Sequence, residues 1–306
     1  MTKITAKKIL LVVFYHILLL IAVLIFIFKY AEEVTQIKAD IYYQFQISDT
    51  VDTNVDFSDY PAFEPEENLW INQAQLIHHA GGGIDGLDYS NSREALENTL
   101  SGGERYIEID FMYTSDHHLV CMHKWAEQWG SETPPTLQEF ISGNIYGKYS
   151  PMTASDLIQY MDQYSDLYII IDTKESDYVN VIRDLVELSS FNPSITDRFI
   201  IQIYDSGAKA EILQLYSFSD SNFLFTAYKF GSRFPNKIMN ICYDENIYIV
   251  TVPYGDWDQE TIDLYRSKNI IIYEHTVNRP DQANEELRRG VHGLYTDFLS
   301  SEDLEL

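Results

Sequence analysis

The sequence predicts an α/β fold, a (β/α)8 TIM barrel preceded by one N-terminal transmembrane helix. Three observations support this. Residues 9–28 form an apolar run, short β-branched and aromatic runs recur eight times after residue 71, and most intervals between them carry an amphipathic helix pattern. Eight strands alternating with helices match such a barrel in number and size. A doubly wound sheet is the alternative, but no glycine-rich phosphate turn follows the first strand.

The amino end is expected to divide into three segments before the barrel. Residues 1–8, which contain three lysines, form a short tail, and the run at 9–28 is interrupted only by His16. At ~1.5 Å per residue this run spans a ~30 Å hydrocarbon core, and the lysines predict a cytoplasmic amino end. Residues 29–70, with ten acidic residues, are expected to form an acidic stalk or collar. The barrel at 71–306 is then expected on the extracytoplasmic side of the cell membrane.

The formal charge of −26 restricts the class of partner. A surface this acidic repels nucleic acid and anionic lipid headgroups. An anionic substrate could bind only where a metal ion or a few placed cations offset the negative charge. The two cysteines, Cys121 and Cys242, do not make a disulfide framework, and two packed thiols are favoured over a bridge.

The strands and helices of the barrel are expected in alternation. Strands are predicted at 74–80, 106–112, 167–173, 198–204, 222–228, 247–253, 269–275 and 293–298. One helix is expected to begin after Ser92 and to end at Gly102. A capping-box pattern at Thr153 and Asp156 begins another, and Ser206 precedes a third. The unusually long interval between the second and third strands is expected to hold an extra element near the site.

The candidate site lies at the carboxyl ends of the first three strands, where barrels of this kind place their chemistry. Glu108 and Asp110 are two residues apart on the second strand, so both carboxylates face the interior. They repel each other unless a cation lies between them, and an oxygen-only site suits Mg²⁺ or Ca²⁺. On the third strand, Asp172 is the expected third metal ligand, and Lys174 is a fixed positive charge for a phosphoryl oxygen.

Two histidines are expected to complete the site. His79 ends the first strand, where the following glycines allow a ligand close to the backbone, and His123 follows a hairpin-like stretch after the second strand. One imidazole would activate the nucleophile and the other would protonate the leaving alkoxide. The metal ion would stabilise the crowded phosphorus centre. By contrast, His78 is expected to be an ordinary polar residue.

At these residues the sequence resembles the glycerophosphodiester phosphodiesterase family over nearly all of 74–299. The order and spacing of the motifs make the match specific. The family's H-R-G resembles His79-Ala80-Gly81, its E-N-T resembles Ser90-Asn91-Ser92, its E-x-D is intact as Glu108-Ile109-Asp110, its catalytic His matches His123, its E-x-K resembles Asp172-Thr173-Lys174, its W-T-V-N strand resembles YEHTVN (273–278), and its G-V-D-G-I-I-T-D resembles GVHGLYTDF (290–298).

The resemblance implies a phosphoric diester hydrolase that cleaves glycerophosphodiesters to an alcohol and glycerol phosphate. The metal would be bound by Glu108, Asp110 and Asp172, the acid/base pair would be His79 and His123, and the substrate would contact Asn91, Lys174 and His275. The vicinal glycerol hydroxyl is a candidate first nucleophile, which would give a cyclic phosphate. The family's phosphate-binding Arg is Ala80 here, its Glu is Ser90, its Asp after the second His is Lys124 and its Trp is His275. Lys124 is a candidate to replace the missing arginine charge.

These departures touch substrate binding and predict an altered substrate. With the membrane anchor, they favour a glycerophosphodiester within a lipid or a surface polymer. One alternative is a phospholipase D-like enzyme of the sphingomyelinase D type, indicated by the D-x-K pattern and expected to form a cyclic phosphate. The other is a barrel without turnover that binds a phosphorylated ligand.

Overall fold

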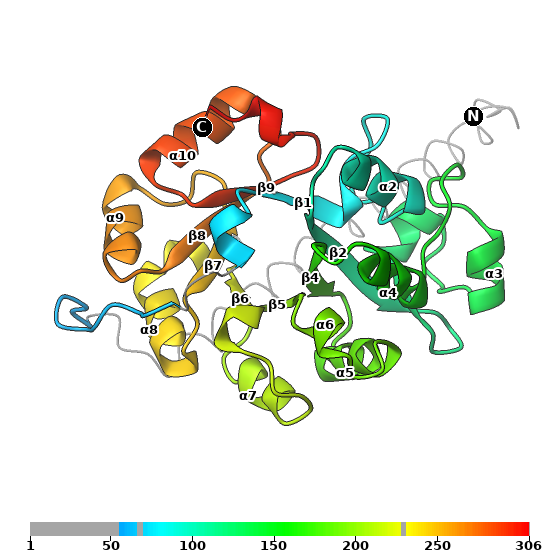
Figure 1. Cartoon of the computed structure of the whole chain (residues 1–306), viewed down its shortest axis with the longest axis horizontal. Coiled ribbons are helices and arrows are strands. Elements are labelled where there is room, and N and C mark those ends of the chain that lie inside the picture. Colours follow the sequence, from blue (N-terminus) through cyan, green and yellow to red (C-terminus); the bar gives the residue numbers. More distant parts are fainter. Residues whose placement is uncertain (1–54, 66–69, 228–230, 306) are drawn as a thin grey trace, which may run out of the picture. The chain divides into compact units, whose positions relative to one another are not determined.

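The structure is a computed structural model that describes residues 55–65, 70–227 and 231–305. Within these ranges eight parallel strands close into a barrel, and β1 pairs with both β2 and β9 (Figure 1). The barrel strands are β1 (Leu76–His78), β2 (Tyr106–Tyr113), β4 (Tyr168–Thr173), β5 (Phe199–Ile203), β6 (Phe223–Thr226), β7 (Ile249–Pro253), β8 (Ile271–His275) and β9 (Gly293–Thr296). The predicted TIM barrel is confirmed, and the doubly wound alternative is wrong because the sheet closes.

The barrel strands are apolar along most of their length because each is covered by side chains in the interior and by helices outside. β4, with the sequence YIIIDT, has its four central residues buried, and β5, FIIQI, is buried throughout. All eight strands lie where the sequence predicts them, to within two residues at most ends.

Helices surround the strands, as Figure 1 shows. They are α2 (Arg93–Ser101), α3 (Leu137–Ser142), α4 (Ala154–Gln163), α5 (Tyr178–Leu188), α6 (Pro193–Thr196), α7 (Ala208–Leu213), α8 (Pro235–Glu245), α9 (Gln259–Ser267) and α10 (Pro280–Arg289). Shorter helical turns are η1 (Trp70–Gln73), η2 (His79–Gly81), η3 (Trp125–Trp129), η4 (Asp220–Asn222), η5 (Gly231–Arg233) and η6 (Ser301–Asp303).

The predicted helix starts have the expected capping contacts in two of three cases. The Ser92 hydroxyl accepts the Ala95 amide at the start of α2. Thr153 and Asp156 form a complete capping box at the start of α4. The helix expected after Ser206 is α7, but a left-handed glycine, Gly207, precedes it rather than a serine cap, because the Ser206 hydroxyl donates to Glu245.

The long interval between β2 and β4 holds a hairpin and its own small core. β3 (Leu119–Cys121) runs antiparallel to the end of β2. Behind it, Val120, Met122, Trp125 and Phe140 pack in a cluster separate from the main barrel core. This extra element, predicted from the length of the interval, brings His123 back to the mouth of the barrel.

The amino-terminal ends of the strands are covered by η1. The Trp70 ring packs against Tyr106, Tyr168 and Tyr273, with ring centroids 6.0–6.3 Å apart. Residues 55–65 pack nearby, where the Lys268 ammonium donates to the carbonyl oxygens of this segment. A closed amino-terminal end leaves the carboxyl ends of the strands as the open face of the barrel.

The predicted transmembrane helix at 9–28, the tail before it and most of the stalk at 29–70 lie outside the described residues. Among the helices that the structure does describe, none has the length and apolarity required to cross a bilayer. Cys121 and Cys242 are both free, buried thiols, as expected.

Candidate functional site

Three carboxylates meet at the carboxyl ends of β2 and β4. Asp110 and Asp172 are direct partners across the two parallel strands, and Glu108 lies two residues before Asp110 on the same face. The three side chains are buried, and one oxygen from each lies within 4.8 Å of the others. Three buried acceptors this close require a cation or protons between them.

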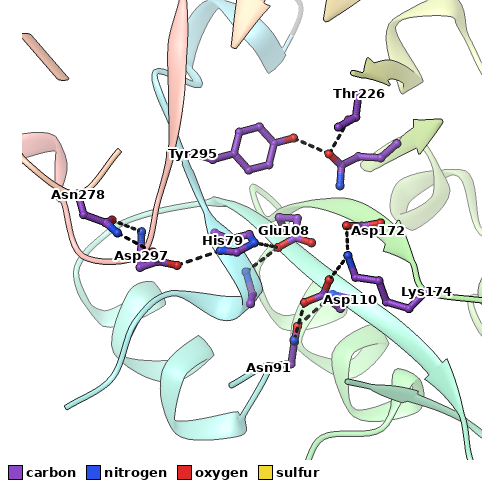
Figure 2. Close-up of polar contacts among 12 residues, drawn as sticks. His79, Asn91, Glu108, Asp110, Asp172, Lys174, Thr226, Asn278, Tyr295 and Asp297 are labelled. Atoms are coloured by element: carbon purple, nitrogen blue, oxygen red, sulfur yellow. Dashed lines mark hydrogen bonds and ion pairs between the residues drawn. The ribbon is translucent and has the colours of Figure 1, made fainter. Parts of the chain in front are cut away.

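Two further side chains hold these carboxylates in place. The Lys174 ammonium lies 2.9 Å from Asp110 Oδ1 and 2.5 Å from Asp172 Oδ2. Asn91 uses both ends of its amide on Asp110, donating from Nδ2 to Oδ2 at 2.8 Å and accepting the Asp110 amide at 3.0 Å (Figure 2). Asn91, expected to bind substrate, is thus placed to orient a carboxylate. Lys174, expected to bind phosphate, is placed between two carboxylates.

Burial and mutual repulsion set the charges of this cluster. Burial raises the pKa of Glu108 well above its usual range, and Asp110 adds to the shift. Burial also raises the pKa of Asp172. Burial acts in the same direction on Asp110, but the charges of Lys174, His123 and His79, with the Asn91 hydrogen bond, together outweigh it and lower the pKa. The raised pKa values of Glu108 and Asp172 show that one ammonium does not suffice to keep all three carboxyl groups ionised, so a further cation would favour their charged forms.

The donor set fits a hard divalent cation. All three ligands are carboxylates, as Mg²⁺ and Ca²⁺ prefer. Glu108 Oε2 accepts the Ala80 amide at 2.6 Å, while Oε1 has no hydrogen-bond partner among the described residues. Asp110 Oδ1 has only the Lys174 ammonium. Burying a carboxylate oxygen without a hydrogen-bond donor costs free energy, and a cation bound between these oxygens would offset that cost.

His79 is the first residue of η2, directly after β1, and its ring turns into the barrel mouth. Its Nδ1 atom lies 2.9 Å from Asp297 Oδ1, and its Nε2 atom lies 3.9 Å from Glu108 Oε2. Burial alone would lower the pKa of His79, but Glu108 and Asp297 outweigh it and raise the pKa to about 9. The preceding residue, His78, pairs instead with Glu104, at 3.4 Å.

Asn278 holds Asp297 in place through two hydrogen bonds. Asn278 donates from Nδ2 to Asp297 Oδ2 at 2.7 Å and accepts the Asp297 amide at 2.7 Å. Figure 2 shows the chain of contacts from Asn278 through Asp297 and His79 to Glu108. His79 Nδ1 faces the Asp297 carboxylate, so Nε2, which faces Glu108, is the nitrogen placed to transfer a proton.

His123 contacts the same tyrosine, Tyr89, as His79 does. The Tyr89 ring centroid is 4.4 Å from that of His79 and 4.4 Å from that of His123. Burial lowers the pKa of His123, although Asp110 opposes the shift. The Met122 amide donates to the Asp110 carbonyl at 2.9 Å, so the residue before His123 is tied to the strand that carries two of the carboxylates.

The remaining positions line the mouth. His275 ends β8, and burial, with the neighbouring His79, lowers its pKa to about 4, so the ring is neutral. Tyr204 donates to Asp172 Oδ1 at 2.7 Å. Lys124 is turned toward solvent, with its side chain 56% exposed and its ammonium 2.6 Å from Glu127.

The structure thus brings Glu108, Asp110, Asp172, Lys174 and His79 into direct contact. Three other residues at this place were not singled out from the sequence. Asp297 and Asn278 stand within quoted motifs, GVHGLYTDF and YEHTVN, so a signal for them existed. Tyr89 has no comparable signal, because its place beside both histidines depends on how its loop folds.

A comparison with curated proteins finds one relative by sequence. A curated glycerophosphodiester phosphodiesterase from Bacillus altitudinis is 22% identical over 238 residues, which cover 71% of this chain and 92% of the relative. No model of a known protein family matches the sequence.

Solved structures show the same fold. A glycerophosphodiester phosphodiesterase from Thermotoga maritima has a TM-score of 0.56 at 19% identity, covering 73% of this chain and 94% of its own. A phosphodiesterase from Oleispira antarctica, in complex with its product sn-glycerol-3-phosphate, has a TM-score of 0.57 at 15% identity, covering 73% and 93%. These proteins are phosphoric diester hydrolases, the enzyme class expected from the sequence. The resemblance of this chain to the glycerophosphodiester phosphodiesterases is confirmed.

Proposed function

We propose that this chain is a metal-dependent phosphodiesterase that hydrolyses a glycerophosphodiester. The observation that carries the proposal is the meeting of three buried carboxylates with His79 at the carboxyl ends of β1, β2 and β4, with His123 close by. The similarity to glycerophosphodiester phosphodiesterases supports the reaction class.

The protein groups have distinct parts in this reaction. Glu108, Asp110 and Asp172 would hold Mg²⁺ or Ca²⁺, which when bound supplies positive charge for the phosphoryl oxygens. One of His79 and His123 takes the proton from the attacking hydroxyl, and the other returns a proton to the oxygen of the departing alcohol as its bond to phosphorus breaks. Asp297 keeps the proton of His79 on Nδ1, so Nε2 transfers protons.

The substrate and the location are part of the same proposal. The apolar run at 9–28 supports a single-pass membrane anchor with the barrel on the extracytoplasmic side. An anchored site favours a glycerophosphodiester carried by a lipid or a glycerol-phosphate surface polymer over a freely diffusing one. The formal charge of −26 supports a substrate that is not nucleic acid.

The test is a substrate panel with the purified protein. Glycerophosphocholine, glycerophosphoglycerol, a lysophospholipid and a teichoic-type polymer are incubated with millimolar Mg²⁺ or Ca²⁺, and released alcohol and phosphorus species are measured. We expect metal-dependent release of alcohol and a phosphomonoester from at least one substrate. A cyclic phosphate as the final product would favour the phospholipase D-like reaction, and no turnover of any substrate would sink the proposal.

Histidine variants separate an enzyme from a barrel that only binds. Turnover should collapse in His79→Ala and His123→Ala while metal binding, measured by calorimetry, survives. His118→Ala, at an exposed position of the β2–β3 turn, serves as the matched control and should keep full activity. Wild-type turnover in both site variants would show that these histidines are not the acid and the base.

A further inference from the structure

Tyr89 contacts both histidines of the candidate site. Its ring meets His79 edge-on, at an interplanar angle of 80°, and lies at 41° to His123, with both centroids 4.4 Å away. The side chain is half-buried, in the loop that joins η2 to α2. A single aromatic ring therefore contacts both members of the proposed acid/base pair.

The loop holds this tyrosine in an uncommon backbone conformation. Tyr89 has a φ of 52° and Asn91 a φ of 47°, in the left-handed region that bulky side chains rarely adopt. The loop is fastened at Asn91, whose amide donates to the Ala80 carbonyl at 2.9 Å and whose side chain is bound to Asp110. These contacts set the backbone from which the Tyr89 ring extends.

The Tyr89 hydroxyl is a donor without a partner. Among the described residues it makes no hydrogen bond, whereas the hydroxyl of Tyr204 donates to Asp172. Burial, followed by the charges of Asp110 and Asp297, raises the pKa of Tyr89 to about 12. The hydroxyl therefore stays protonated and is available to donate.

The nearby cations are engaged elsewhere. The Lys174 ammonium contacts two carboxylates, Asp110 and Asp172. The Lys124 ammonium pairs with Glu127 in an exposed position. A neutral donor beside the carboxylate cluster is thus the group that the chain itself offers beside the histidines.

The geometry of in-line displacement at phosphorus indicates what the Tyr89 hydroxyl can contact. The attacking and leaving oxygens lie on opposite sides of phosphorus, so the base and the acid stand at the two ends of the reaction axis. A group beside that axis that contacts both the acid and the base is within reach of the non-bridging oxygens. We propose that the Tyr89 hydroxyl donates a hydrogen bond to a non-bridging phosphoryl oxygen while its ring spaces His79 and His123. This inference rests on the proposed function and deepens it.

The test compares Tyr89→Phe, which keeps the ring, with Tyr89→Leu, which removes ring and hydroxyl. Binding of inorganic phosphate to the metal-loaded full chain is measured by calorimetry, beside kcat and KM on the best diester and the metal affinity alone. We expect Tyr89→Phe to weaken phosphate binding and kcat/KM by about tenfold, as for loss of a hydrogen bond to a charged group, with metal affinity unchanged. Tyr89→Leu should bind phosphate as Tyr89→Phe does but lower kcat further.

Tyr243→Phe is the matched control, because its hydroxyl donates to the Pro61 carbonyl beside the barrel's closed end. It should leave phosphate binding and kcat/KM unchanged. Phosphate binding equal in Tyr89→Phe and the wild type would overturn the inference even if the wild type hydrolyses diesters. Weaker binding in Tyr89→Leu alone would overturn it too, since the ring would then be responsible. If no diester is hydrolysed but phosphate binding depends on the hydroxyl, the proposed function fails and the contact stands.

Discussion

The Nδ1 atom of His79 lies 2.9 Å from Oδ1 of Asp297, although 218 positions separate the two residues in the chain. The contact exists because β9 pairs with β1 and closes the barrel, with His78 opposite Thr296 in register. Each partner directly follows its strand, so the closing of the sheet also assembles the oriented histidine. The arrangement of His79 and Asp297 therefore depends on the pairing of β1 with β9, which is the seam where the barrel closes.

Asp297→Asn should lower kcat by on the order of 10²-fold or more, the range of general acid–base catalysis. The carboxylate accepts the Nδ1 proton, whereas an amide nitrogen in its place donates and favours the opposite imidazole tautomer. Steady-state kinetics on the best substrate of the panel checks this. Asp281→Asn, on the exposed face of α10, is the control and should behave as the wild type. Unchanged kcat in Asp297→Asn would show that orientation of His79 does not limit the reaction.

Glu108→Gln should abolish the stabilisation by metal without destabilising the metal-free protein. Glu108 is buried against Asp110, and its raised pKa shows that the ionised form is disfavoured without a cation. A neutral isostere removes that repulsion but also removes a ligand. Metal affinity should fall by more than the ~10-fold typical of losing an outer-shell partner.

Thermal unfolding with and without Mg²⁺ or Ca²⁺ measures both effects of Glu108→Gln. The wild type should gain thermal stability on metal addition, and the variant should gain little while equalling or exceeding the metal-free wild type. Glu127→Gln, at an exposed position, is the control and should keep the full metal response. An equal response in wild type and Glu108→Gln would mean that the carboxylate cluster is not the metal site.

Much of the barrel could be predicted from the sequence because each strand and most helix starts are marked by residues close together in the chain. A parallel strand buried on both faces appears as a short apolar run, as in β4 and β5. Capping residues such as Thr153 mark helix starts through contacts three residues away. The residue before α7 could not be predicted in this way, since the Ser206 hydroxyl bonds to Glu245, a residue distant in the chain, and does not cap the helix.

The residues of the candidate site likewise fall into those that a local sequence pattern predicts and those that it does not. Period-2 spacing places Glu108 and Asp110 on one face, and the same pattern on the next barrel strand supplies Asp172. Partners brought in by closure of the barrel or by loop geometry carry no such local signal. Asp297 reaches His79 across the seam, and Tyr89 reaches both histidines through a left-handed loop residue.

Arg198→Lys should destabilise the fold without touching the chemistry. Its guanidinium is buried beneath the barrel's helices and donates to four backbone carbonyls at 2.7–2.9 Å, those of Ser194, Tyr164, Leu167 and Met161. A single ammonium cannot reach all four, and buried carbonyls without donors cost about 2–4 kcal/mol together. Chemical denaturation measures the loss, with exposed Arg279→Lys as the control. Equal unfolding midpoints for Arg198→Lys and the wild type would contradict this account.

Glu274 should make the protein less stable as pH rises. It is fully buried on β8, where the Gly255 backbone and the Arg289 charge favour its ionised form too weakly to offset burial. Burial, with Glu286 adding to it, raises its pKa from 4.5 to about 8. Between these values the unfolded chain has lost the proton and the folded chain retains it. The stabilisation is therefore complete below about pH 4.5 and is lost as pH rises through about 8.

Glu274→Gln removes this titration while keeping the shape of the side chain. Urea denaturation at a pH near 5 and a pH near 8 should show a smaller fall in the free energy of unfolding for the variant than for the wild type. The difference, a few kcal/mol at most, isolates Glu274 because every other titrating group is shared. Glu285→Gln, exposed on α10, should keep the wild-type slope. If Glu274→Gln also keeps that slope, the Glu274 carboxyl is not held in its neutral form by its burial.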